Sequence, residues 1–310
     1  MLDLIIVGGG PAGVAAAVYA ARKRLRTALV LEEWGGQSNV STDVQNWIGT
    51  KHLTGAELAK NLREHAEEYK GEFLDIRVGT RASKLNTFDD HIEIETSKEH
   101  LDAKAALLAP GASRRKLEVP GAKEYDQKGL TYCASCDGPL FAEKDVVVIG
   151  GGNAGFETAL ELLEYCKSVT LLHRGDAFKA DEITIAAAKA HPNFTAVLNA
   201  ETLEVVGEQF VTGLRYKDIT TSAESKLSVE GIFVEVGLVP NTEWIDNALE
   251  RNKIGQVMVD PRTQRASHPR VWAAGDCTNG LYHQNNIAAG DAVKALEDVY
   301  MFLRRGKRDD

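Results

Sequence analysis

DLIIVGGGPAGVAAAVYAARKRLRTALVLEE (residues 3–33) returns later in the chain as DVVVIGGGNAGFETALELLEYCKSVTLLHRG (residues 145–175). Each copy reads as a short apolar strand, a glycine turn, an amphipathic helix and a second apolar strand. Each also contains G-x-G-x-x-G, whose glycines permit a tight turn, the approach of a pyrophosphate and close packing of helix on strand. One such motif is a weak signal. Two in the same strand–turn–helix setting predict an α/β protein with two Rossmann-like dinucleotide-binding units.

The two glycine loops supply the candidate phosphate-binding residues. Their backbone N–H groups would face a pyrophosphate at the start of the following helix, where the helix dipole favours negative charge. The candidates are Gly8, Gly10, Pro11, Ala12 and Gly13 in the first loop, and Gly150, Gly152, Asn153, Ala154 and Gly155 in the second.

The copies differ at the residue that should meet a ribose. Glu32 ends the second strand of the first copy, and Arg174 occupies the same position in the second copy. An acid accepts hydrogen bonds from free ribose hydroxyls, which suits FAD or NAD. Arg174 with the nearby Lys179 suits the 2′-phosphate of NADPH. Two alternatives stay open: Glu33 in place of Glu32, and a surface ion pair as the role of Arg174.

The segments between and after these copies are rich in strands. Residues 91–112 and 210–242 each read as a β-meander that returns to a last buried strand, consistent with three-layer (ββα) units. Glycine, proline and asparagine cluster at residues 111–122 and 237–244. We expect the chain to cross between the two units at these clusters.

The bulk composition is that of a globular protein with two domains. The chain has 310 residues, of which 44% are apolar and 26% charged, and one compact core rarely holds that many. The net charge of −9 argues against nucleic acid or an anionic membrane as the main partner. We find no signal peptide and no apolar run of the roughly 18 residues that a membrane span needs, so we expect a cytoplasmic protein.

Four cysteines are present, and two of them lie close together in TYCASCDG, residues 131–138. Structural disulfides are uncommon in the cytoplasm, so Cys133 and Cys136 indicate a catalytic or metal-binding pair. Zinc normally takes four ligands, and only the isolated Cys166 and Cys277 remain. We therefore expect a redox-active pair and no metal. Cys166 lies in a helical segment, where packing is its expected role.

Six motifs follow one another along the chain: GGGPAG (8–13), GGQ (35–37), CxxCDG (133–138), GGGNAG (150–155), GIFVEVGLVPNT (231–242) and AAGDCT (273–278). Their order resembles the low-molecular-weight thioredoxin reductases, and more closely the reductase core of the flavoprotein component of alkyl hydroperoxide reductase. The resemblance covers essentially the whole chain. It implies a discontinuous FAD-binding domain, residues 1–113 and 245–310, with an NAD(P)H-binding and redox-disulfide domain, residues 114–244, inserted in it. It also implies a homodimer and a rotation of the inserted domain.

The resemblance also implies roles for individual residues. Electrons would pass from a nicotinamide to the flavin, then to the Cys133–Cys136 disulfide, and then to the disulfide of a partner protein. Cys136 would face the flavin and Cys133 would attack the partner. Asp137 would be the general acid, with a turn-capping aspartate as the alternative. The flavin-side residues would be Gly35, Gly36, Gln37, Asn46, Gly275, Asp276, His283, Gln284 and Asn285, with a bond to the backbone as the alternative for Asn46.

The nicotinamide motif departs from the family pattern. HRGDAFK (residues 173–179) keeps His173 and Arg174 but has Gly175 and Lys179 where arginines are usual in thioredoxin reductases. We therefore expect NADPH as the electron donor, with NADH as the second choice and another donor as the third.

The residues expected near the flavin also depart from the family pattern. Pro110 stands where a threonine is usual, and His283, Asn285 and Asn286 add unusual polar side chains near the expected flavin. These side chains could change the flavin potential or the contact with a second protomer. The hypothesis fails if His283 and both asparagines point away from the flavin.

The leading hypothesis is an FAD-dependent disulfide reductase that passes electrons to thioredoxin or a thioredoxin-like protein. A reductase for a separate peroxiredoxin-like or glutaredoxin-like partner is the nearest alternative. A ferredoxin-dependent enzyme would have lost the second glycine loop, which is intact here. A redox sensor without turnover fits least, because both loops accompany a Cys-x-x-Cys pair. We expect no nucleic-acid or membrane partner.

Overall fold

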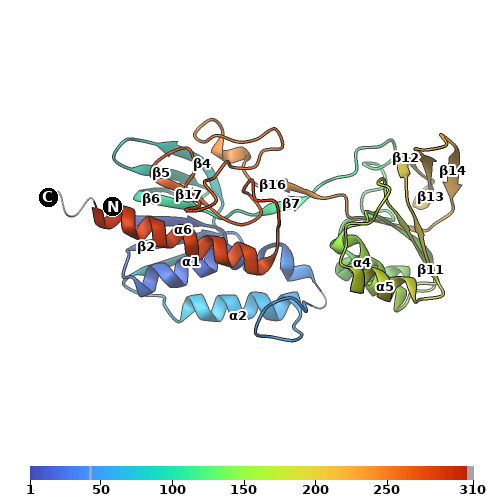
Figure 1. The fold of residues 1–310 in the computed structure, drawn as a ribbon, viewed down its shortest axis with the longest axis horizontal. Coiled ribbons are helices and arrows are strands. Elements are labelled where there is room, and N and C mark those ends of the chain that lie inside the picture. Colours follow the sequence, from blue (N-terminus) through green and yellow to red (C-terminus); the bar gives the residue numbers. More distant parts are fainter. Residues whose placement is uncertain (42–43, 306–310) are drawn as a thin grey trace. The chain divides into compact units, whose positions relative to one another are not determined.

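The computed structural model describes residues 1–41 and 44–305, apart from the side chains of Ser135, Cys136 and Arg305. The chain forms two compact units, whose elements are labelled in Figure 1. Unit 1 consists of Met1–Ser113 and Val239–Asp310, and unit 2 of Arg114–Leu238, so unit 2 is inserted in unit 1. The second crossing follows Leu238, a few residues before the expected boundary at residue 244.

Unit 1 is built on a seven-stranded sheet in the order β3-β2-β1-β6-β5-β4, with β17 paired to β6. Strands β1, β2, β3, β6 and β17 are parallel, and the β4–β5 hairpin continues the sheet antiparallel to β6. The bounds are β1 (Leu2–Val7), β2 (Thr27–Leu31), β3 (Leu74–Val78), β4 (Ala82–Thr87), β5 (Ile92–Thr96), β6 (His100–Leu108) and β17 (Val271–Ala273).

A continuous apolar run in β1 is buried on both faces of this sheet. Leu4 and Ile6 pack on the face covered by α1 and α6, and Ile5 and Val7 pack on the opposite face. Each of these buried side chains contributes about 1.5–3 kcal/mol of hydrophobic free energy, as is usual for a central parallel strand. The loop that follows β1 is therefore held in place. The helices of unit 1 are α1 (Pro11–Arg22), α2 (Gly55–Glu67) and α6 (Asn285–Arg305).

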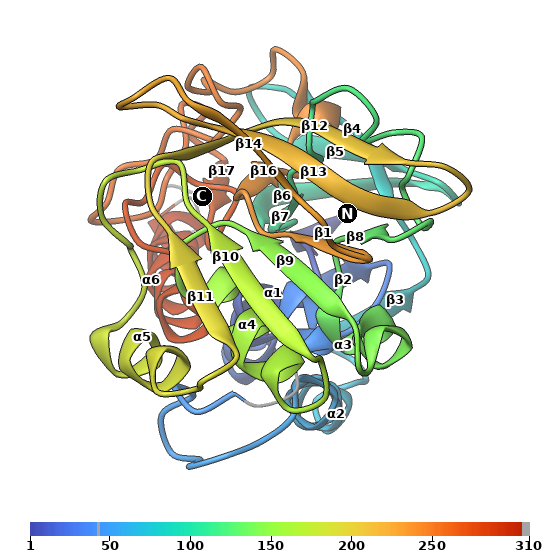
Figure 2. The ribbon, with the colours of Figure 1, turned by 90° about the vertical axis from the view of Figure 1, so that its right-hand side faces the viewer.

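Unit 2 contains a five-stranded parallel sheet in the order β11-β10-β9-β15-β8. Helices α4 and α5 pack on one face, and the antiparallel sheet β12-β13-β14 packs on the other (Figure 2). The bounds are β8 (Leu130–Thr131), β9 (Asp145–Ile149), α4 (Asn153–Leu163), β10 (Ser168–Leu172), α5 (Glu182–Lys189), β11 (Phe194–Val197), β12 (Ala200–Gly207), β13 (Val211–Asp218), β14 (Glu224–Leu227) and β15 (Gly231–Val234).

The two crossings between the units pair with each other as the short strands β7 and β16. The predicted fold class, an α/β protein with two Rossmann-like units of which the second is inserted in the first, is confirmed. None of the described helices is both long enough and apolar enough to cross a membrane. The remaining short elements are η1 (Gly36–Val40), β7 (Ala112–Arg114), α3 (Ala134–Asp137), η2 (Gly138–Phe141), β16 (Leu238–Pro240) and η3 (Glu243–Ile245).

Candidate functional site

The first glycine loop joins β1 to α1 in unit 1. A Cβ on Gly8, at φ 124°, would lie 2.0 Å from the carbonyl oxygen of Ala109, and a Cβ on Gly13 would lie 1.8 Å from that of Gly8. Only glycine fits at either position. No side chain caps α1 at Gly10. Pro11 has no backbone N–H. The N–H groups of Ala12 and Gly13, in the first turn of the helix, therefore keep their capacity to bind a phosphate.

The second glycine loop repeats this geometry in unit 2, between β9 and α4. A Cβ on Gly150, at φ 133°, would lie 2.1 Å from the carbonyl oxygen of Glu235, and one on Gly155 would lie 2.0 Å from that of Gly150. A Cβ on Gly152 would meet no protein atom within 4 Å, and no side chain caps α4 there. The start of α4 therefore offers both open space and N–H groups to a phosphate.

The two expected ribose-binding residues lie at the surface in ion pairs. Arg81 Nε is 3.8 Å from Glu32 Oε2, and Arg174 Nη2 is 3.4 Å from Glu201 Oε1. The side chain of Arg174 is 78% exposed. An ion pair between exposed groups contributes only about 0–1 kcal/mol, so Glu201 would compete weakly with a phosphate for this guanidinium.

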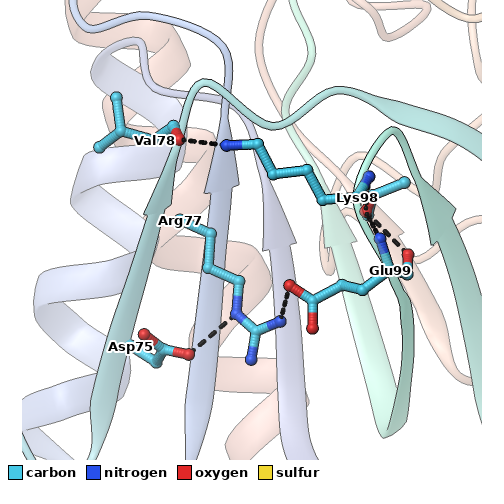
Figure 3. A network of polar contacts seen from close by, with 6 residues as sticks. Asp75, Arg77, Val78, Lys98 and Glu99 are labelled. Atoms are coloured by element: carbon cyan, nitrogen blue, oxygen red, sulfur yellow. Dashed lines mark hydrogen bonds and ion pairs between the residues drawn. The ribbon is translucent and has the colours of Figure 1, made fainter.

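A network of polar contacts surrounds the end of β3 (Figure 3). Arg77 in β3 forms an ion pair with Glu99, and Lys98 Nζ donates to the carbonyl oxygen of Val78 at 3.2 Å. The residue after Val78 donates its backbone N–H to the carbonyl oxygen of Glu32 at 3.2 Å. This network therefore supports the sheet edge that carries the expected ribose site of unit 1.

His173 and Lys179 lie beside the second glycine loop. A Cβ on Gly151 would lie 2.6 Å from Cγ of His173, so the imidazole packs directly against the loop. Its Nε2 is buried and has no hydrogen-bond partner within the described part of the chain. Lys179 N donates to the carbonyl oxygen of Gly151 at 2.8 Å. Asn153 Oδ1 accepts from Asp181 N at 2.7 Å, which ties the start of α4 to the segment before α5.

The predicted flavin-side residues of unit 1 come together from two segments far apart in the sequence. Gln37 Nε2 donates to Asp276 Oδ2 at 3.3 Å, and Asn46 Nδ2 donates to Gln284 Oε1 at 3.0 Å. Among the described residues, the side-chain amide of Asn46 therefore bonds the side chain of Gln284, and its role toward a flavin stays a prediction. Gly275 precedes Asp276, and Gly35 and Gly36 follow β2 beside the first glycine loop.

The unusual asparagines at the start of α6 bond to neighbouring protein groups. Asn285 Oδ1 accepts from Ser38 Oγ at 2.7 Å. Asn286 Nδ2 donates to the carbonyl oxygen of Asn46 at 2.5 Å, and its Oδ1 accepts from Ile48 N at 3.4 Å. Both side chains therefore fasten the segment after β2 to α6. An effect of these asparagines on a flavin stays a prediction.

His283 and Pro110 also make contacts of their own. His283 Nε2 lies 2.9 Å from the carbonyl oxygen of Gly280, and Nδ1 lies 3.7 Å from Asp276 Oδ1. Burial raises the pKa of Asp276, and the nearby His283 acts in the opposite direction. The carbonyl oxygen of Pro110 accepts from Asn241 Nδ2 at 2.9 Å.

The redox loop of unit 2 begins at Cys133, which is disulfide-bonded. Its N–H donates to Thr131 Oγ1 at 3.2 Å, and the Thr131 hydroxyl donates to the carboxylate of Asp137. Asp137 makes no capping bond to η2, although it immediately precedes it. The side chain of Cys136 lies outside the described part of the structure, so the pairing of Cys133 with Cys136 stays a prediction.

The other two cysteines are buried free thiols. Burial raises the pKa of Cys166 to about 11 and that of Cys277 to about 12. Cys166 Sγ donates to the carbonyl oxygen of Phe141 at 3.2 Å. Since the thiolate is the reactive form, neither residue is suited to attack a disulfide, and both are suited to packing.

Thr131 and a pocket beside it were not predicted from the sequence. The pocket has a volume of about 380 Å³ and reaches Thr131 and Asp137. Leu140, 71% exposed, and Phe210, 63% exposed, form part of its apolar lining, and Lys144 and Glu230 add one charge of each sign. The hydroxyl two residues before Cys133 was a visible signal for Thr131. Nothing in the sequence linked Phe210 to the redox loop.

The chain belongs to the pyridine nucleotide-disulphide oxidoreductase family, whose model matches residues 2–292. Within it, the structure resembles thioredoxin reductase from T. acidophilum, with 37% identity, a TM-score of 0.91 and coverage of 97% of this chain and 98% of that one. The sequence is 41% identical over 303 residues to NADH dehydrogenase of Bacillus subtilis and 40% identical over 304 residues to an alkyl hydroperoxide reductase component of Staphylococcus epidermidis.

These matches confirm the resemblance to the thioredoxin reductases and to the alkyl hydroperoxide reductase component. Both curated matches cover 98% of this chain, but the chain spans only 59% of the length of either relative. Members of the family bind FAD and a nicotinamide dinucleotide. The two glycine loops fit such ligands, because each combines a glycine-only turn with an uncapped helix start.

Proposed function

We propose that this protein is an FAD-dependent disulfide reductase that passes electrons from NAD(P)H, through the flavin and a Cys133–Cys136 disulfide, to thioredoxin or a thioredoxin-like protein. The observation that carries the proposal is the disulfide-bonded Cys133 in the same unit as the second glycine loop, with Asp137 one helical turn away. A reducible disulfide and a site for the reductant are the two parts such an enzyme needs.

Unit 1 would hold FAD and unit 2 would hold the nicotinamide dinucleotide. Glu32 would accept hydrogen bonds from the adenosine ribose of FAD, and Gln37, Asp276, Gln284 and the residues around them would line its other end. Arg174 and Lys179 would bind a 2′-phosphate, which makes NADPH the preferred donor and NADH the second choice. When bound, these cofactors would supply the hydride and electron chemistry that no side chain here can perform.

The chain's own residues would carry out the exchange with the partner. Once reduced, the Cys133 thiolate attacks one sulfur of the partner disulfide, forming a mixed disulfide and releasing a partner thiolate. Asp137, oriented by Thr131, passes a proton from water to that leaving thiolate. The Cys136 thiolate then attacks Cys133, which restores the Cys133–Cys136 disulfide and releases the second partner sulfur as a thiolate that takes up a proton from water.

The pocket beside Asp137 is where we place the partner. Its exposed apolar residues, Leu140 and Phe210, suit a protein surface better than a small polar disulfide. A thioredoxin-like protein is the first choice of partner. We propose that the enzyme itself is a cytoplasmic homodimer. The relative described as an alkyl hydroperoxide reductase component favours a second candidate, a separate peroxiredoxin-like or glutaredoxin-like partner.

The experiment that tests this function follows oxidation of NADPH in the presence of one partner at a time. Thioredoxin coupled to a chromogenic disulfide, a peroxiredoxin with peroxide, and a glutaredoxin-like protein are compared at equal concentration. Turnover with thioredoxin alone supports the first choice. Turnover with the peroxiredoxin alone replaces it by the second. The proposal is contradicted if NADPH reduces the flavin but the enzyme turns over no protein disulfide.

A further inference from the structure

An ion pair between Arg114 and Glu235 lies at the end of β15, and its carboxylate is buried. Glu235 directly follows this strand, and its side chain is only 5% exposed. Its Oε1 lies 3.2 Å from Nη1 of Arg114 and accepts a hydrogen bond of 3.2 Å from Thr158 Oγ1. Burial of a carboxylate costs several kcal/mol before pairing, so a polar group at this place needs an explanation.

Glu235 lies next to the second glycine loop. Strands β9 and β15 are parallel neighbours, and Ile149 pairs with Val234, so Gly150 and Glu235 leave the sheet side by side. A Cβ on Gly150 would lie 2.1 Å from the carbonyl oxygen of Glu235 and 3.3 Å from its Cβ. The backbone and Cβ of Glu235 therefore lie next to the loop that would bind the pyrophosphate, and its carboxylate contacts Thr158 in the helix that follows this loop.

The sheet order decides which half of a dinucleotide Glu235 would meet. On one side of β9 lies β10, followed by Arg174, and on the other side lies β15, followed by Glu235. A dinucleotide crosses such a sheet at the switch point, with its pyrophosphate at the glycine loop. If the adenosine ribose lies toward Arg174, the nicotinamide half extends over the end of β15.

We propose that Glu235 is the residue that recognises the nicotinamide ring, and that Arg114 and Thr158 position it. Its carboxylate would accept the N–H of the ring's carboxamide. Its negative charge would favour the cationic ring of the oxidised nucleotide over the uncharged ring of the reduced one. The inference rests on the proposed function of unit 2 as the nicotinamide-binding unit and names the group that distinguishes the two forms of the nucleotide.

A purely structural ion pair would behave differently. Arg114 begins unit 2 and belongs to the crossing strand β7, so the pair with Glu235 also ties that strand to the end of β15. Loss of such a tie would lower the melting temperature of the protein. It would also weaken the binding of every nucleotide by a similar factor. Loss of a negative charge beside the ring would weaken only the binding of a nucleotide with a cationic ring. The ratio of the affinities for a cationic and an uncharged nucleotide therefore separates the two roles.

The test measures equilibrium dissociation constants by calorimetry on the full chain with its flavin. The ligands are NADP⁺ and tetrahydro-NADP, a redox-inactive analogue with an uncharged ring. For Glu235→Gln we expect the dissociation constant of NADP⁺ to rise about three- to tenfold and that of the analogue to change less than about twofold. Glu164→Gln, at the exposed far end of α4, makes the same charge change and should leave both constants unchanged.

Each other outcome has a definite meaning. Equal changes in both constants, or no change in either, overturn the role of Glu235 while leaving the nicotinamide site intact. A wild-type protein that binds neither ligand overturns the nicotinamide site itself, and the inference with it. If Glu235→Gln does not fold, Glu235→Asp replaces it. This substitution keeps the charge but shortens the side chain by one methylene, so the preference for NADP⁺ over the uncharged analogue should fall by a smaller factor. An unchanged preference would overturn the inference.

Discussion

Thr131 donates a hydrogen bond from its hydroxyl to the carboxylate of Asp137. The same hydroxyl oxygen accepts the N–H of the disulfide-bonded Cys133 at 3.2 Å. One side chain therefore connects the start of the redox loop to its acidic end. Because Asp137 is held by Thr131 and does not cap η2, its carboxylate is oriented by a side chain and not by the following turn.

Asp137→Asn should slow reduction of the partner disulfide by about 10²-fold, because the departing thiolate loses its proton donor. Thr131→Val should cause a smaller loss, and Thr131→Ser, which keeps the hydroxyl, should restore most of the rate. Stopped-flow mixing of reduced enzyme with oxidised thioredoxin measures the step directly. Flavin reduction by NADPH should be unchanged in all three variants. A parallel loss of flavin reduction would show that Asp137 serves the fold of unit 2.

Cys133→Ser should abolish turnover of a protein disulfide yet leave the flavin reducible by the nucleotide. Cys166→Ala is the matched control, because this buried thiol has a pKa raised to about 11 and should not react. Full turnover is expected for the control. The measurement combines steady-state thioredoxin reduction with anaerobic flavin spectra. If Cys133→Ser also blocks flavin reduction, the order of electron transfer proposed here is wrong.

Arg174→Ala should raise the KM for NADPH about tenfold, because one charge-assisted hydrogen bond to the 2′-phosphate is lost. The KM for NADH should change little. Glu201→Gln frees Arg174 from its ion pair and should leave the KM for NADPH unchanged or lower it. Initial rates measured with NADPH and with NADH give the two KM values for each variant. An unchanged KM for NADPH in Arg174→Ala would assign Arg174 to the surface ion pair alone.

Asp3 should make unit 1 less stable in acid. It accepts hydrogen bonds from Lys104 Nζ at 2.9 Å and Arg26 N at 3.1 Å. Burial acts to raise its pKa, but these contacts more than offset burial and leave the pKa below its usual 3.8. The ionised group therefore stabilises the fold above about pH 4, and that stability is lost as the pH falls through the lower pKa of the folded state.

Asp3→Asn tests this dependence by urea unfolding at neutral pH and again below pH 4. The variant should be less stable than the wild type at neutral pH, and the difference should shrink in acid. Asp102→Asn, an exposed residue of β6, should leave the curve unchanged. A difference between Asp3→Asn and the wild type that stays constant across the two conditions would contradict the titration of Asp3.

The repeated motif allowed most of the fold to be predicted. Gly13 stands at a fixed spacing from Gly8 because a Cβ on Gly13 would meet the carbonyl oxygen of Gly8, and that spacing is visible in the sequence. The equivalent positions of Glu32 and Arg174 were visible for the same reason. Local geometry of this kind depends on neighbours in the chain, so a single sequence records it.

The contacts that close the candidate sites were not predictable in the same way. Gln37 meets Asp276, and Ser38 meets Asn285, across more than two hundred residues, and no local pattern signals such pairs. Glu235 was missed for another reason. An acid after a strand reads as a surface residue, and only the fold buries it. The resemblance to a known family named Asp276 and Asn285 without showing which groups they bond.

Transfer of electrons from a nicotinamide to the flavin is tested by an anaerobic titration of the purified, flavin-loaded protein with NADPH and, separately, with NADH. We expect NADPH to bleach the oxidised flavin band promptly and at lower concentration than NADH, after which added oxidised thioredoxin restores the band. A flavin that neither nucleotide reduces would contradict the assignment of the second glycine loop as the electron-donor site.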